Sequence, residues 1–111
     1  MVVINKNKMH NNCCIKLSEA LKTGLHQFLL LDIRNQSQFS NRHLPGAVNI
    51  PFEWLRENLS AISVNSNIIL IGEKNPEKTE LAKQFLYKNG ITKVATLCGG
   101  IKAWSTEIQF S

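Results

Sequence analysis

The chain has 111 residues, of which 43% are hydrophobic, and a formal net charge of +5. This size and composition are typical of one globular domain with its own core. Because no apolar run approaches the roughly 18 residues that cross a bilayer, we expect no membrane contact. The positive charge gathers partly near the N-terminus, and no basic run with interleaved aromatic residues appears. We therefore expect no nucleic-acid binding.

The N-terminal residues show no export signal, because a hydrophobic segment and a small-residue cleavage site are both missing. A cytoplasmic location is the expectation. Residues 1–12 are rich in Asn and Lys and predict a frayed tail, which leaves 13–111 as the domain.

The three cysteines are Cys13, Cys14 and Cys98, an odd number without CxxC or CxxH spacing. This pattern predicts reduced thiols in a cytosolic protein rather than a disulfide scaffold or a zinc site. The three histidines lie far apart in the sequence. We therefore expect neither a metal nor a cofactor.

The first predicted elements are a short strand at CCIK and a short helix in SEALKTG. Ser18 is a suitable N-cap for that helix, and Gly24 a suitable end. The next segment, FLLLD (28–32), is continuously apolar, which is typical of a strand buried on both faces.

A short helix around Phe39 is expected next, capped by Asn35 or Ser37. Residues 47–50 then form a short strand after the Pro45-Gly46 turn. The spacing of apolar residues in 52–59 predicts a further helical segment.

The second half begins with another all-apolar strand, NIILI (67–71). The strongest helix prediction covers 79–89, with Gly90 as its end and a buried stripe of Leu81, Phe85 and Leu86. A strand in ITKVATL, a sharp turn and a helix in IKAW complete the chain. Alternating strands and helices predict an α/β fold with a largely parallel sheet.

Three motifs resemble the rhodanese (thiosulfate sulfurtransferase) domain family. LLDIR is similar to the family's L-L-D-V-R, NRHLPGAVNIP to G-H-I-P-G-A-x-N-I-P, and LCGGIKAW to L-x-G-G-x-x-x-W. The resemblance covers residues from about 14 to 105. It implies a rhodanese-like sheet of five mostly parallel strands flanked by helices.

The residues in these motifs have structural explanations that need no catalysis. We expect Asp32 to accept hydrogen bonds from backbone N–H groups, with Arg34 balancing its charge or forming a surface pair. His43 is expected to make a hydrogen bond within its turn. Gly99 and Gly100 allow positive φ, and Trp104 is core or pocket wall.

The resemblance also implies an active-site loop, and here the chain departs from the family. Rhodaneses carry sulfur as a persulfide on a Cys that follows the fourth strand and opens a C-x-x-G-x-R-S loop. Its position falls on Glu73 or, with a slip of one residue, on Gly72. The degenerate loop consists of Glu73, Lys74, Asn75, Pro76, Glu77, Lys78 and Thr79. Thr79 is still a suitable N-cap for the helix that follows.

The missing thiol leaves three hypotheses. The first is an inactive rhodanese-like domain that serves as a binding or regulatory module, with Glu73 filling the loop and a protein partner on the 73–79 surface. The second is a sulfurtransferase or sulfur carrier that uses Cys98 or a partner's thiol. The third is a decayed loop with no role of its own.

Overall fold

The computed structural model describes residues 14–73 and 75–108. The predicted tail, Cys13 and Lys74 lie outside the described residues. No helix in the described part of the chain is both long and apolar enough to cross a membrane.

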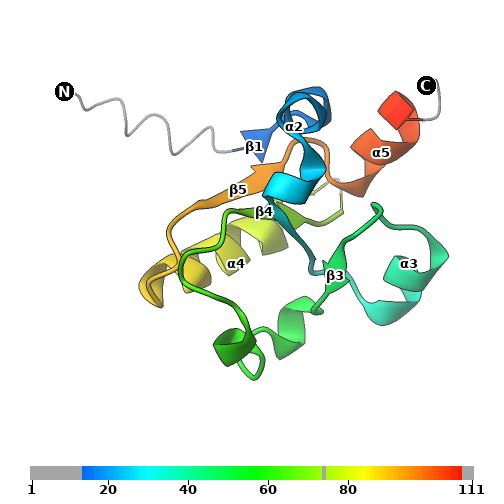
Figure 1. Ribbon diagram of the computed structural model, residues 1–111. Coiled ribbons are helices and arrows are strands. Elements are labelled where there is room, and N and C mark those ends of the chain that lie inside the picture. The colour runs from blue at the N-terminus through cyan, green and yellow to red at the C-terminus, as the bar shows by residue number, and fades with distance from the viewer. Residues whose placement is uncertain (1–13, 74, 109–111) are drawn as a thin grey trace.

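A five-stranded sheet forms the centre of the molecule, and every pairing in it is parallel (Figure 1). The predicted α/β architecture is thus confirmed. In spatial order the strands are β1 (Cys14–Ile15), β5 (Val94–Leu97), β4 (Ile68–Ile71), β2 (Leu29–Asp32) and β3 (Val48–Asn49).

Helices cover both faces of the sheet (Figure 1). The α-helices are α2 (Leu17–Thr23), α3 (Gln36–Asn41), α4 (Glu77–Lys88) and α5 (Ile101–Ile108). Three short 3-10 helices accompany them: η1 (Leu25–Gln27), η2 (Phe52–Trp54) and η3 (Leu59–Ala61).

The core lies in two layers, one on each face of the central strands. Leu70 points into a cluster with Ala82 and Leu86 of α4, whereas Ile69 and Ile71 belong to a cluster on the side of α2 and α5. All four residues of β4 are buried. This explains the uninterrupted apolar runs, because alternate side chains of a strand must suit opposite core layers.

Two helix boundaries on the N-terminal side can be compared with the sequence analysis. Helix α2 begins at Leu17 with Lys16 in the N-cap position, so the prediction of Ser18 as N-cap was wrong. The earlier start lets Leu17 and Ala20 face the core together. Gly24 ends α2 with a φ of 107°, as predicted, and the Asn35 side chain caps α3 by accepting from Gln38 N at 2.8 Å.

Helix α4 starts two residues earlier than predicted, and its buried face differs. Its N-cap position is Pro76, so Thr79 is not the N-cap. Of the predicted stripe, Leu86 is buried and Phe85 packs partly buried against the core, but Leu81 is 50% exposed and was wrongly included. The other buried residues of α4 are Thr79, Ala82 and Lys83. A lysine stem can cover apolar surface, which a search for purely apolar residues does not detect.

The predicted helical segment over 52–59 was only partly correct. The chain instead forms η2, a series of turns and then η3. Leu55 is buried there, and Phe52 and Leu59 pack against the same core layer as α4.

Candidate functional site

A cavity of about 420 Å³ opens where β2 and β4 end. Parallel neighbours bring their carboxyl ends to one edge of the sheet, which is where α/β proteins commonly bind ligands. Its lining comes from four places in the chain: the turn after β2, α3, η2 and the loop into α4. The lining residues are Ile33, Arg34, Asn35, Gln38, Glu53, Gly72, Glu73, Asn75, Glu77, Lys78 and Thr79.

A buried ion pair between Asp32 and Arg34 supports one wall of this cavity. Arg34 Nη2 lies 2.9 Å from Asp32 Oδ2, and Arg34 Nε lies 3.0 Å from Asp32 Oδ1. The backbone N–H of Arg34 also donates to Asp32 Oδ1, and Arg34 Nη2 donates to Arg42 O. The guanidinium charge is therefore balanced by Asp32.

The turn after β2 is held by one further side chain. Asn49 Nδ2 donates to Asp32 O at 3.0 Å and to Arg34 O at 2.9 Å. These bonds join β3 to the turn and fix the backbone beside the cavity.

His43 lies outside the cavity lining. Its Nδ1 is 2.8 Å from Phe39 O, and its ring stacks on the Phe39 ring with centroids 3.9 Å apart. The partner of His43 is thus the carbonyl of a residue in α3 rather than a group within the Pro45-Gly46 turn.

Glu73 has room for a side chain facing the cavity, and Gly72 does not. Gly72 is buried, and a Cβ there would lie 2.6 Å from Thr79 Cγ2. Glu73 is exposed and lines the cavity. Of the two positions that the sequence leaves for the family's Cys, the geometry favours 73.

The carboxylate of Glu73 receives no hydrogen bond from any described residue. The hypothesis that this carboxylate fills a cradle of loop N–H groups therefore lacks a supporting contact in the described part of the chain. Polar groups of the loop instead form hydrogen bonds with one another.

Residues 75–79 leave few backbone donors to receive an anion. Pro76 has no N–H. The N–H of Glu77 donates to Asn75 Oδ1 at 3.0 Å, and the Thr79 hydroxyl donates to Pro76 O at 2.8 Å. The entry to α4 is thus stabilised internally, and two positions of the loop offer no free N–H group.

The charges around the cavity favour cationic over anionic groups. Lys78 Nζ lies 3.2 Å from Glu53 Oε2, and Arg34 is matched by Asp32. The two remaining lining carboxylates, Glu73 and Glu77, make no ion pair with a described residue. Among the described lining residues, the charges without an ion-pair partner are therefore negative, which disfavours an anion beside them.

The exposed ion pair between Glu53 and Lys78 at the rim of the cavity affects the pKa of Glu53. Its own backbone N–H, followed by the hydrogen bond and the charge of Lys78, holds the pKa of Glu53 below its ordinary value. The carboxylate is thus charged at neutral pH, and the pair is lost only as the pH falls through that lowered pKa.

The Gly99-Gly100 turn packs against the start of the site loop, as we call the loop of residues 73–79. Gly99 and Gly100 have φ of 79° and 61°, and a Cβ at Gly100 would collide with the backbone carbonyls of Gly72 and Glu73. Ile101 N donates to Gly72 O at 2.8 Å. Trp104 is half-buried against the core layer of α2 and does not line the cavity.

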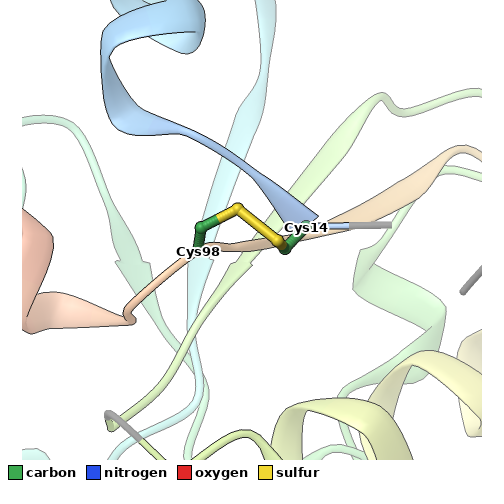
Figure 2. The surroundings of a disulfide bond; sticks show 2 residues. All are labelled: Cys14 and Cys98. Carbon is green, nitrogen blue, oxygen red and sulfur yellow. A yellow bond between two sulfur atoms is a disulfide. The ribbon is translucent and has the colours of Figure 1, made fainter. Parts of the chain in front are cut away.

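Cys98 is not in the cavity lining and forms a disulfide with Cys14 (Figure 2). The Cα atoms are 4.9 Å apart, and the sequence separation is 84. The prediction of reduced thiols was therefore wrong for this pair. Strand β1 lies beside β5 with Cys14 opposite Thr96, so Cys98, the residue directly after β5, is two residues beyond the partner of Cys14. Only the strand order reveals this proximity.

Among the described residues, no group of three or more His, Cys, Asp or Glu side chains could hold a metal ion. The described lining of the cavity presents carboxylates, amides, a hydroxyl, a guanidinium and a lysine.

The chain is similar in sequence to rhodanese-like proteins. The model of the family "Rhodanese-like domain" matches residues 15–107. A Bacillus subtilis relative, the "Uncharacterized protein YqhL", is 32% identical over 91 residues, which are 82% of this chain and 71% of that protein. The "Putative sulfur carrier protein YrkF" of the same organism is 26% identical over 80 residues, covering 72% of this chain and 43% of YrkF.

Solved structures share the fold. The rhodanese-related protein from Thermoplasma volcanium superimposes with a TM-score of 0.76 at 21% identity, covering 85% of this chain and 91% of that one. The Alr3790 protein from Anabaena gives a TM-score of 0.71 at 31% identity over 81% of this chain and 70% of that one.

Proposed function

This chain belongs to the rhodanese-like domain family, and we propose that it serves as a binding module whose site loop does not carry sulfur. The observation behind the proposal is Glu73. It faces the cavity at the position where the resemblance implies the persulfide-bearing Cys.

The chemistry of the lining supports the absence of sulfur transfer at this site. Sulfur transfer by a thiol requires a thiolate and an environment that stabilises negative charge. The described residues of the lining include no Cys, Ser or His, and their one hydroxyl, on Thr79, is engaged with Pro76 O. Glu73 and Glu77 oppose the entry of an anionic sulfur donor.

The same features favour a partner that presents positive charge. A lysine or arginine side chain of a protein could enter the cavity between Glu73 and Glu77. The Asp32–Arg34 pair and the α4 entry hold the walls in place, so little ordering would be needed on binding.

A direct assay tests the loss of sulfur transfer. The full-length protein is incubated with thiosulfate and cyanide, and thiocyanate is measured for the wild type and for Cys98→Ser. We expect neither to exceed the uncatalysed background. Wild-type turnover that Cys98→Ser abolishes would instead support the second function, a sulfurtransferase or sulfur carrier based on Cys98.

Capture experiments test the binding surface. We expect proteins retained from lysate by the wild type to be lost with Glu73→Lys/Glu77→Lys. Glu19→Lys makes the same type of charge change on α2, away from the cavity lining, and should retain them. Equal capture by both variants would contradict a partner site at this loop.

A further inference from the structure

The disulfide lies apart from the cavity lining, beside the edge strand β1 of the described sheet. Among the strands of the described residues, β1 is the outermost on its side and pairs with β5. Cys14 is exposed, whereas Cys98, the residue directly after β5, is half-buried. Cys14 is thus the more exposed residue of the pair.

We propose that Cys14 and Cys98 form a reversible thiol–disulfide exchange site whose substrates are small thiols and disulfides. This exchange site is separate from the proposed binding site, because neither cysteine lines the cavity.

The unequal exposure sets the direction of the reaction. A thiolate attacks the Sγ atom of Cys14 and forms a mixed disulfide. The Cys14–Cys98 bond breaks, and Cys98 leaves as a thiolate that takes a proton from water. A second thiolate attacks the external sulfur of the mixed disulfide, which releases Cys14 and an external disulfide. Two external thiols are thereby oxidised, and the protein disulfide is reduced to two thiols.

The surrounding structure keeps both partners in place for the reverse reaction. The N–H of Cys98 donates to Ile15 O at 2.9 Å, so β1 and β5 stay joined by a backbone bond without the sulfur link. Leu17 and Ala20, directly after β1, are 1% and 0% exposed. They hold the start of α2 in the core, so a reduced Cys14 stays within reach of Cys98. Its high effective concentration favours renewed bond formation.

Mixed-disulfide trapping tests the site. The oxidised protein, as wild type and as Cys13→Ser, is mixed with reduced glutathione in native buffer, quenched with acid, alkylated with N-ethylmaleimide and mapped by mass spectrometry. The Cys13→Ser variant removes the third thiol, so that labels are assigned without exchange among three cysteines. We expect glutathione on Cys14 and N-ethylmaleimide on Cys98. Glutathione found on Cys98 instead would overturn the proposed direction of attack.

The dependence on denaturant separates a folded reaction site from an inert disulfide. If the folded protein reacts, the exchange rate should change less than about twofold in low urea; a reaction that needs unfolding should accelerate steeply, as opening becomes more frequent. The reduced protein should also recover the Cys14–Cys98 bond in oxidised glutathione. Exchange limited by unfolding, or failure to recover this bond, would refute the site.

Discussion

Gly100 occupies a position where the backbone of the closing turn and the backbone of the site loop touch. Its φ of 61° lies in the left-handed region, and the carbonyls of Gly72 and Glu73 fill the space that a Cβ would need. Glycine is thus required twice at this position, for conformation and for space. Because Gly100 has no Cβ, the backbone of the closing turn can pack directly against the loop that carries Glu73.

We predict that Gly100→Ala lowers the free energy of unfolding by about 2 kcal/mol or more, from backbone strain and the collision with the loop. Urea denaturation measures this. Gly46→Ala is the matched control, because Gly46 also has positive φ, 83°, but no group beyond its chain neighbours lies within 4 Å of the place that a Cβ would take. It should lose only the strain, roughly 1 kcal/mol. Equal losses would show that the contact with the loop is unimportant.

The Asp32–Arg34 pair gives a second prediction for a single residue. Arg34→Met leaves the Asp32 carboxylate buried without its partner and should cost about 3–5 kcal/mol of unfolding free energy. Lys78→Met breaks the ion pair with Glu53, in which both side chains are 63% exposed. It should leave the free energy of unfolding unchanged within error. Thermal or urea unfolding of both variants gives the comparison.

Glu53 offers a prediction about pH. Lys78→Met should raise the pKa of Glu53 toward its ordinary value but not fully, because its own backbone N–H is the largest cause of the lowering. An NMR titration of the Glu53 carboxyl resonance in both proteins measures the two values. An unchanged pKa in the variant would mean that Lys78 does not contact Glu53 in solution.

Single residues differ in how far the sequence alone places them. The motif that contains Asp32 and Arg34 indicates a local interaction, since the two are neighbours along the chain. Cys14 and Cys98 are distant in sequence, and their contact follows from the order of strands in space. Thr79 was misassigned as a cap because Pro76 can also occupy the first non-helical position.

Helix α4 is the element that connects the site loop to the core. Its first turn contributes Glu77, Lys78 and Thr79 to the cavity, while Leu86 anchors the last turn at 0% exposure. Loss of that anchor should therefore affect the whole element.

We predict that Leu86→Ala destabilises the protein by about 2–5 kcal/mol through lost apolar contacts and a cavity. Leu81→Ala removes the same atoms from a side chain that is 50% exposed and should change stability by no more than about 0.5 kcal/mol. Circular dichroism in a urea series measures both. A large loss from Leu81→Ala would return that residue to the buried stripe that the sequence predicts.

The elements themselves were predictable to different degrees. The runs at 28–32 and 67–71 identify the central strands, because burial on both faces leaves no polar alternation. The buried face of α4 could not be predicted from apolar residues alone, because it includes the polar Thr79 and the charged Lys83. The segment after Pro51 has apolar residues at helical spacing but forms 3-10 helices and turns. The sequence did not predict this, because apolar spacing alone does not distinguish a 3-10 helix from an α-helix.

At the scale of the whole molecule, the order of motifs indicates the α/β sheet, and the structure adds a covalent link between its first and last strands. The disulfide constrains the unfolded chain over a separation of 84 residues. Such a long loop restricts the unfolded ensemble strongly.

We predict that Cys14→Ser lowers the free energy of unfolding by about 2–4 kcal/mol relative to the oxidised wild type. Adding a reductant should bring the wild type close to the variant and leave the variant unchanged. Urea denaturation with and without reductant provides the four curves. A reductant effect that persists in Cys14→Ser would assign the stabilisation to something other than this bond.

The same bond turns nearly all of the folded domain into a closed covalent circle. A protease that cuts one peptide bond in the exposed segment 63–65 would open the circle without separating its parts. Both halves of the sheet would stay attached through Cys14 and Cys98, and their strands could keep their pairing. A nicked molecule would therefore migrate as one chain until its sulfurs were reduced, and only then divide into two fragments.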